Sequence, residues 1–253
     1  MTRTVAPFTW PGGKRAALSI TFDDARPSQL DNGMQIFTRH GLKATFYALP
    51  DGVRMRRDGW KQVVAAGHEI GNHTVSHPCS GNFAFSRRNA LEDYTLERME
   101  RDELLAANDA LEELLGVRPR TFAYPCGQRF VGAGEHTRSY VPVVARHFTV
   151  GREAFDETPN DPTICDLAQI AALDMDGRDG ERLRSLVRWA IDEQRWLVLA
   201  GHDVGARGPQ TVASDSLEEL CRYTHDRHDV LWTDTVFAIG SFIARARRPG
   251  SGP

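Results

Sequence analysis

The chain has 253 residues, enough for one large domain, and its 41% hydrophobic and 26% charged residues are typical of a globular protein and exclude a disordered one. Lys and Arg total 31 and Asp and Glu total 34, so the net charge of −3 argues against nucleic-acid and anionic-membrane partners, which need clustered positive charge. The longest apolar runs, such as residues 196–200, are far shorter than the roughly 20 residues of a membrane span.

Along the chain, short apolar runs alternate with stretches in which apolar residues recur at helical spacing. The expected strands cover residues 16–22, 44–48, 68–71, 121–123, 143–150, 170–173, 196–200 and 230–232. The expected helices cover about residues 30–40, 60–66, 91–115, 183–191, 215–227 and 234–246. This alternation indicates an α/β protein whose parallel strands are joined by right-handed crossovers, either in a closed barrel or in an open sheet.

The two ends and the cysteines carry little functional signal. The first 15 residues hold no apolar secretory stretch, which favours a cytoplasmic location, although a secreted protein shown without its leader would look the same. We expect a single domain over residues 1–253, with a frayed tail at 245–253, where basic side chains mix with Gly and Pro. Cys79, Cys126, Cys165 and Cys221 form no metal-binding or redox motif, and we expect free thiols.

The residues that follow the expected strands are the ones best suited to chemistry. They are Asp23, Asp24, Asn72, His73, His77, Tyr124, Pro125, Arg152, Asp174, Asp176, His202 and Asp203. In parallel α/β folds the carboxyl ends of the strands build the active site, so we expect these side chains to meet. Taken singly, each also suits a turn, a helix cap or a structural role.

A metal site is the simplest use of these residues. Asp23 and Asp24 end a strand, where adjacent side chains can diverge, so that one binds a cation and the other stays free. His73 and His77 are four residues apart, and on a helical turn both imidazoles would reach one ion. Two His and one Asp leave a position open for water and substrate, as catalytic zinc sites do, and also suit Co²⁺ or Ni²⁺. His202, at another strand end, can act as a general acid.

Four segments carry a resemblance to a known family: T-F-D-D at 21–24, H-T-V-S-H at 73–77, F-A-Y-P-C-G at 122–127 and L-V-L-A-G-H at 197–202. In order and spacing they resemble the motifs of the polysaccharide deacetylases, the NodB-homology enzymes of carbohydrate esterase family 4. The resemblance covers the chain from Trp10 to about Ala244. It implies a distorted (β/α) barrel of about seven parallel strands, and a metal-dependent hydrolase that removes N- or O-linked acetyl groups from a carbohydrate.

The resemblance also implies a role for each residue. Asp23 is then the base, and Asp24, His73 and His77 hold a divalent ion, with zinc expected first. His202 is then the acid that protonates the leaving group.

The third motif departs from the family's pattern. Ala123 stands where the family has an Arg that orients the base, and Arg152 is our candidate to replace that Arg. Tyr124, Pro125 and Cys126 would contact the substrate, and a backbone N–H near Cys126 would stabilise the oxyanion. Cys126 stands where the family usually has an aromatic residue.

The fourth motif and the substrate stay open. The family's Asp beside a Trp is missing, so Asp174 is the candidate to hold His202, with Asp176 as the alternative. The polymer and the acetyl linkage depend on the loops at 79–90, 128–142 and 203–214. Two other functions remain: an allantoinase-like hydrolase of a cyclic amide, compatible with W-P-G-G-K-R at 10–15, and an inactive carbohydrate-binding homologue.

Overall fold

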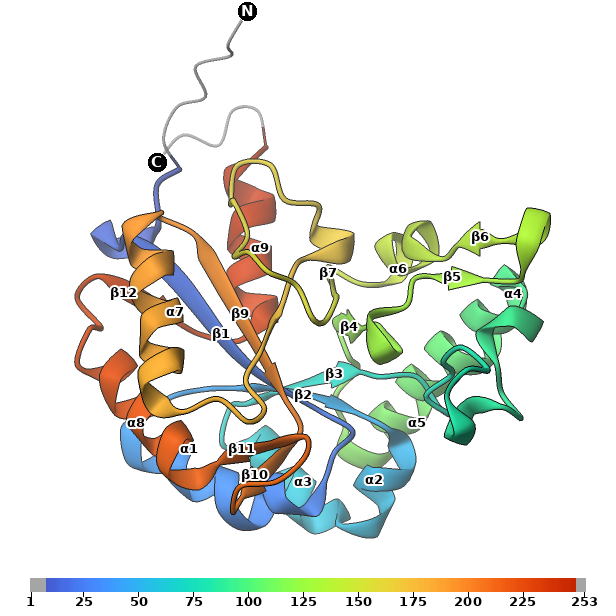
Figure 1. Ribbon diagram of the computed structural model, residues 1–253, viewed down its shortest axis with the longest axis horizontal. Helices are drawn as coiled ribbons and strands as arrows, with labels where there is room; N and C mark the ends of the chain where they lie inside the picture. The colour runs from blue at the N-terminus through green and yellow to red at the C-terminus, as the bar shows by residue number, and fades with distance from the viewer. Residues whose placement is uncertain (1–7, 249–253) are drawn as a thin grey trace, which may run out of the picture.

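A parallel sheet forms the centre of the molecule, a computed structural model that describes residues 8–248 (Figure 1). Its strands follow the order β7-β4-β3-β2-β1-β9-β8, and β12 pairs with the first half of β1. The bounds are β1 Ala16–Asp23, β2 Thr45–Ala48, β3 Glu69–Asn72, β4 Thr121–Ala123, β7 Val150–Arg152, β8 Leu173–Asp174, β9 Trp196–Gly201 and β12 Leu231–Thr233. The expected parallel arrangement is confirmed, and the strands lie within a few residues of their predicted positions except β7, which begins only at Val150, the end of the predicted strand 143–150.

The segment before β8 brings the two edges of the sheet together. Ile170 forms a parallel bridge with Arg152 of β7, and its amide donates to the carbonyl of Gly151 at 2.8 Å. Three residues later Leu173 pairs with Leu199 of β9. The same short segment therefore contacts both ends of the strand order and closes the sheet into the distorted barrel that the sequence predicts.

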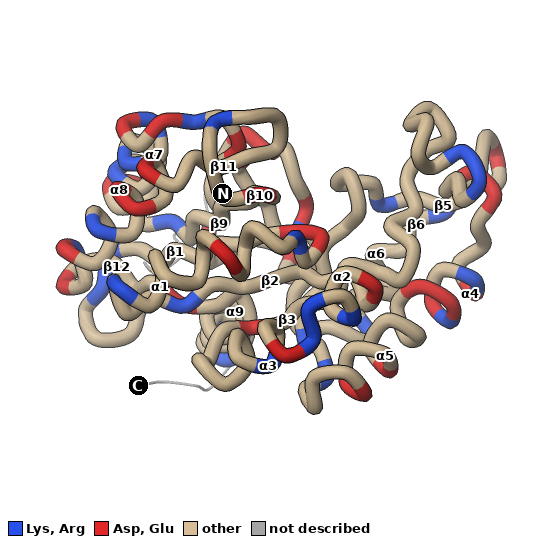
Figure 2. Tube along the Cα trace, turned by 90° about the horizontal axis from the view of Figure 1, so that it is seen from below, with Lys and Arg blue, Asp and Glu red and all other residues tan. Residues whose placement is uncertain are grey.

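Helices pack on the barrel, mostly on its outer side; the last helix instead packs against the opposite face of β1 and β9, with Ala17 and Val198 (Figure 1). They are α1 Met34–His40, α2 Pro50–Met55, α3 Arg57–Ala65, α4 Leu96–Arg98, α5 Ala106–Leu115, α6 Val141–His147, α7 Gly180–Asp192, α8 Ser214–His225 and α9 Val236–Ala246. Two small strand pairs, β5 Phe130–Val131 with β6 Arg138–Ser139 and β10 Asp203–Gly205 with β11 Thr211–Ala213, lie in the loops. In Figure 2 basic and acidic residues are interspersed along the Cα trace.

The alternation of side chains along β1 decides which residue reaches the barrel interior. Leu18 and Phe22 pack into the large core beneath the outer helices, together with Phe37 and Trp60. Ile20 shares this face, whereas Ser19 and Thr21 lie on the other face of the strand, because successive side chains alternate. This alternation places Asp23, the last residue of β1, on the inner face at the carboxyl end of the barrel.

One predicted strand is a helix. Residues 143–150 hold several valines and read as a strand, but α6 occupies Val141–His147 and β7 begins only at Val150. Pro142 lies in the first turn of α6, where its fixed φ suits a helix, and Val143 and Val144 bury one side of it. The predicted helix at 91–115 also begins late, at Leu96, and the hydroxyl of Thr95 caps it.

Residues 245–248 do not form part of the frayed tail that the sequence predicts at 245–253. Helix α9 continues to Ala246, and the guanidinium of Arg247 donates to the carbonyls of Pro162 and Cys165, both at 2.7 Å. Residues 249–253 lie outside the described residues. Across residues 8–248 there is no helix whose length and apolar character would let it cross a membrane.

Candidate active site

A cavity of about 660 Å³ opens where the carboxyl ends of the strands converge. Its lining includes eight of the residues that the sequence singles out: Asp23, Asp24, His73, His77, Tyr124, Cys126, Asp174 and His202. These residues come from five different strands or the loops that follow them, so the barrel brings together groups far apart in the sequence.

Asp23 is held by a buried arginine. The Nη2 atom of Arg152, at the end of β7, donates to both carboxylate oxygens of Asp23 at 2.5 and 2.6 Å. Arg152 is fully buried, its Nη1 donates to the carbonyl of Glu153, and its guanidinium lies over the ring of Tyr47. Burial alone would raise the pKa of Asp23, but Arg152 and the nearby histidines lower that pKa to about 2. Asp23 is therefore a carboxylate at any working pH.

Asp24, His73 and His77 form a donor set that fits a metal ion. The Oδ1 atom of Asp24 lies 3.6 Å from Nε2 of His73 and 3.7 Å from Nε2 of His77, and one ligand atom from each residue lies within 4.8 Å of the others. The Nδ1 atom of His73 lies 2.9 Å from the carbonyl of Ala123, which makes Nδ1 the donor and leaves Nε2 free to bind an ion. Burial and the neighbouring His73 lower the pKa of His77, so its ring is neutral, as a ligand must be.

The two histidines meet through a loop and not through the helical turn that the sequence suggests. Thr74 and His77 have φ values of 68° and 51°, which no α-helix contains. The side chain of Asn72 accepts a hydrogen bond from the amide of Thr74, and the hydroxyl of Thr74 accepts one from the amide of His77. The carboxylate of Glu103 accepts the amides of Val75 and Ser76. These bonds stabilise a tight loop that folds His77 back beside His73.

Arg26 is a site residue that the sequence analysis missed. Its guanidinium donates to Oδ2 of Asp24 at 2.8 and 3.0 Å and to Oδ2 of Asp203 at 2.7 Å. With Oδ2 of Asp24 taken, Oδ1 is the oxygen that faces the two histidines. A basic residue two positions after a strand-end Asp pair is the only signal in the sequence for this contact.

His202 is paired with Asp176, not with Asp174. The Nδ1 atom of His202 lies 2.6 Å from Oδ2 of Asp176, and its amide donates to Oδ1 of the same carboxylate. Asp174 accepts the amide of Asp176 and lines the cavity. The chain turns after β8, with Gly177 at φ 70°, and this turn brings Asp176 over the end of β9. A side chain at Gly201 would collide with Val212 there.

The environment of His202 favours its charged form. Burial would lower the pKa of His202, but the hydrogen bond that its Nδ1 donates to Asp176 and the negative charge of Asp23 outweigh burial and raise it. A raised pKa extends to higher pH the range in which the imidazole is protonated.

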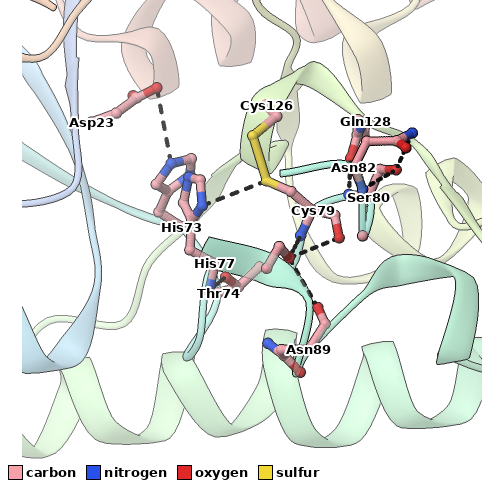
Figure 3. Close-up of a disulfide and its surroundings, with 12 residues drawn as sticks. Asp23, His73, Thr74, His77, Cys79, Ser80, Asn82, Asn89, Cys126 and Gln128 are labelled. Carbon is pink, nitrogen blue, oxygen red and sulfur yellow. Dashed lines mark hydrogen bonds and ion pairs between the residues drawn. A yellow bond between two sulfur atoms is a disulfide. The ribbon is translucent and has the colours of Figure 1, made fainter. Parts of the chain in front are cut away.

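The third motif forms a tight turn closed by a disulfide, against our expectation of free thiols. Cys126, with φ 52°, is bonded to Cys79, and their Cα atoms are 6.4 Å apart (Figure 3). Sequence spacing could not reveal this bond, because it depends on β3 and β4 being neighbours, which places the loops after them side by side. Cys165 and Cys221 are free, as expected.

The other residues of the third motif take different positions. Tyr124 lines the cavity and donates its hydroxyl to the carbonyl of Ala168, whereas Pro125 is buried and begins the turn.

Three phenylalanines that the sequence analysis did not identify, together the phenylalanine wall, also line the cavity. Phe83, Phe85 and Phe155 are 42%, 67% and 64% exposed. The ring of Phe85 lies 6.0 Å from that of His77 and 5.4 Å from that of Phe83, measured between centroids. The loops at 79–90 and 203–214 do reach the cavity, the latter through Gln210, but no residue of the 128–142 loop is among those that line it.

A parallel (β/α) barrel with acids and imidazoles at the carboxyl ends of its strands is the architecture in which barrel enzymes carry their active sites. The sequence model of the polysaccharide deacetylases matches residues 11–140, and the chain belongs to this family. The resemblance stated from the four motifs is thereby confirmed.

Individual relatives agree with this assignment. A peptidoglycan-N-acetylglucosamine deacetylase of Bacillus cereus is 31% identical over 126 residues, which is 48% of this chain and 40% of the relative. A Mycobacterium smegmatis structure assigned to the polysaccharide deacetylases has a TM-score of 0.70 at 16% identity, covering 98% of each chain. A cobalt-bound acetyl xylan esterase of Clostridium thermocellum has a TM-score of 0.58 at 17% identity, covering 88% of this chain and 91% of that one. The chain spans less than half the length of the curated relatives it matches.

Proposed function

We propose that the protein is a metal-dependent hydrolase that removes acetyl groups from a carbohydrate. One observation carries the proposal: a metal donor set, an ionised carboxylate and a carboxylate-paired histidine surround a single cavity. The family assignment supports the reaction class and favours neither the cyclic amide hydrolase nor the inactive homologue. Because two groups of relatives act on N-acetylglucosamine or chitooligosaccharides by their names, N-acetylated glucosamine oligomers are the first substrates to test.

Asp24, His73 and His77 are the proposed ligands of a divalent ion, with zinc first and Co²⁺ or Ni²⁺ as alternatives. A bound ion would supply Lewis-acid polarisation of the acetyl carbonyl and would acidify the attacking water. Polarising the carbonyl and acidifying the water both need open coordination positions on the ion. A set of only three protein ligands leaves such positions open.

Asp23 is the proposed base. A carboxylate with a pKa near 2 is always ionised, and it accepts a proton only from a strongly acidified water. The two hydrogen bonds from Arg152 fix the plane of this carboxylate, which is the orienting role expected of Arg152.

His202 is the proposed acid, and Asp176 favours its protonated form and orients its ring. Nε2 then carries the proton that goes to the departing oxygen or nitrogen. An amine leaves only when protonated, so N-deacetylation needs this proton more than O-deacetylation does.

The turn after β4 offers one backbone donor for the oxyanion. The amides of Gly127 and Gln128 donate back to Tyr124 and Pro125, and Pro125 has no N–H. The amide of Cys126 is therefore the candidate donor, and a donor held in this way stabilises an oxyanion by about 3–4 kcal/mol.

The phenylalanine wall is the proposed platform for the sugar. Phe83, Phe85 and Phe155 present large apolar faces beside the metal donors, and the C–H faces of a pyranose ring can pack on such surfaces. We expect Phe85→Ala to raise KM for an acetylated oligosaccharide several-fold while kcat stays within a factor of two. A fall in kcat with KM unchanged would contradict this role.

The disulfide changes the expected location. Disulfides persist in oxidising compartments and are rare in the cytosol, so Cys79–Cys126 favours a location outside the cytoplasm. A glycan of the cell envelope or the surroundings is consistent with this compartment.

The deciding experiment is acetate release from N-acetylated and O-acetylated oligosaccharides by metal-stripped protein and by the same protein after addition of Zn²⁺ or Co²⁺. We expect turnover only with metal. Release of no acetate from any acetylated sugar, by protein that binds metal, would overturn the proposal.

A further inference from the structure

A covalent bond joins the two loops that carry the metal ligand His77 and the third motif. Cys79 lies two residues after His77 and is fully buried, whereas Cys126 lies in the wall of the cavity (Figure 3). We propose that the Cys79–Cys126 disulfide is a positioning element of the metal site, so that tight metal binding requires the oxidised protein. This inference rests on the proposed function, because it takes Asp24, His73 and His77 as the ligands.

The two histidines are oriented by different neighbours. His73 has its Nδ1 atom 2.9 Å from the carbonyl of Ala123, a contact of the kind that usually orients a metal-binding imidazole. His77 instead has the Sγ atom of Cys79 beside its Nδ1, at 3.6 Å. Sulfur is only a weak hydrogen-bond acceptor, so this contact alone does not fix the ring of His77. The orientation of the ring therefore depends on how firmly the rest of the structure holds Cys79.

Cys79 is held on three sides. Its amide donates to the hydroxyl of Ser86 at 2.8 Å, its carbonyl accepts the amide of Leu91 at 3.0 Å, and its sulfur is bonded to Cys126. Only the third of these ties reaches the loop after β4. The first two remain when the disulfide is broken, so the loop can stay folded while losing its link to the opposite wall.

The backbone on both sides of the bond is in a conformation that needs support. His77 and Cys126 have φ values of 51° and 52°, in the left-handed region that residues other than Gly seldom occupy. Such conformations persist where the surrounding structure holds them in place. The disulfide spans 47 residues and connects these two segments directly.

A hydrogen bond next to the disulfide also connects the same two loops. The amide of Ser80 donates to the side-chain oxygen of Gln128 at 2.7 Å, one residue beyond Cys79 and two beyond Cys126 (Figure 3). Gln128→Ala removes this hydrogen bond and leaves the disulfide intact. The variant therefore compares the effect of losing the weaker tie with the effect of losing the covalent one.

Reduction of the disulfide is a two-electron step. A dithiol such as dithiothreitol supplies two electrons and two protons, the S–S bond breaks, Cys79 and Cys126 become thiols, and the dithiol is oxidised to its own disulfide. The ring of His77 then loses its fixed neighbour, and the amide of Cys126 loses its fixed distance from the ligands.

The test measures the dissociation constants of Zn²⁺ and Co²⁺ and the visible absorption of the Co²⁺ form. It compares the oxidised protein, the reduced protein freed of dithiol, and the Cys79→Ser/Cys126→Ser double variant. Cys165→Ser is the matched control, because it removes a free, half-buried thiol whose sulfur contacts Arg247. We expect about 10–100-fold weaker binding and an altered cobalt spectrum in both forms without the bond, a smaller loss in Gln128→Ala, and no change in the control.

Two results would overturn the inference: metal affinities within a factor of two in all forms, or an unchanged cobalt spectrum after reduction. If the double variant does not fold, the reduced wild-type protein decides, with its far-UV circular dichroism recorded to show that it is folded. An oxidised protein that binds no metal would instead overturn the proposed metal site itself, so the two failures are distinguishable.

Discussion

His77 and His202 line the same cavity, yet their surroundings push their protonation in opposite directions. Burial and the adjacent His73, whose ring centroid is 4.8 Å away, lower the pKa of His77 despite the two aspartates nearby. At His202 the Asp176 carboxylate, 2.6 Å from Nδ1, outweighs burial and raises the pKa. The same side chain is thus biased toward its neutral form on one side of the cavity and toward its charged form on the other.

The contrast arises because the loops after different strands place different groups beside His77 and beside His202. The loop after β3 supplies a second imidazole and a sulfur, neither of which stabilises a positive ring. The turn after β8 supplies a carboxylate in hydrogen-bond contact. Environments that push the pKa values of like groups apart are the usual means of dividing acid, base and ligand roles within one site.

The largest expected effect comes from removing a proposed metal ligand, His77. We expect His77→Ala to reduce bound metal from about one ion per chain to almost none and to abolish turnover, because two protein ligands hold an ion poorly. Elemental analysis and acetate release on one preparation measure both. His136→Ala, at an exposed position outside the cavity, is the control. A folded His77→Ala protein with full metal content would refute the ligand assignment.

Asp23→Asn should separate the base from the ligands. The amide keeps the shape of the carboxylate but accepts no proton, so we expect kcat to fall by ~10²–10⁴ with metal retained. The test is to measure kcat and bound metal in the same sample of the variant. Loss of metal together with activity would mean that Asp23, and not Asp24, is the ligand.

Removing His202, the proposed acid, should reduce turnover less than removing a metal ligand or the base. We expect His202→Ala to slow turnover by ~10²-fold, to keep the metal, and to flatten the basic limb of the kcat/KM profile, because no group is left to protonate the leaving atom. The loss should be larger on an N-acetyl than on an O-acetyl substrate. A variant that keeps its basic limb and near-normal rates on both substrates would make His202 structural.

The smallest effect tests the origin of the contrast. Asp176 raises the pKa of His202, so Asp176→Asn should lower it, and activity that requires the protonated imidazole should then be lost at lower pH. We expect the basic limb to move to lower pH. Asp174→Asn is the matched comparison, since Asp174 makes no hydrogen bond to His202 in residues 8–248, and should move the limb less. Equal shifts in the two variants would contradict the pairing.

Much of the site could be anticipated because it depends on short-range rules. Apolar runs place the strands, and the carboxyl ends of parallel strands share one edge, so Asp23, Asp24, His73 and His202 were expected together before any contact was known. Arg152 was also expected there, since it ends a strand at the same edge. The alternation of β1 further determines that Asp23 and Phe22 lie on opposite faces.

What the sequence could not decide lies in loops and in contacts between distant segments. Asp174 and Asp176 are equally plausible partners of His202 by spacing, and only the turn at Gly177 selects Asp176. The path of each loop depends on side chains far along the chain, which local periodicity does not contain.

The sequence by itself determined the alternating strands and helices, the strand-end acids and histidines and the family, because these follow from periodicity and from motifs that are contiguous in the chain. The tertiary structure decided the disulfide, the phenylalanine wall and the Arg26 contact. The disulfide exists because β3 and β4 are neighbours in the sheet, although Cys79 and Cys126 are 47 residues apart in the chain. The protonation of each histidine was decided in the same way, since it depends on which charges the fold places within a few ångströms.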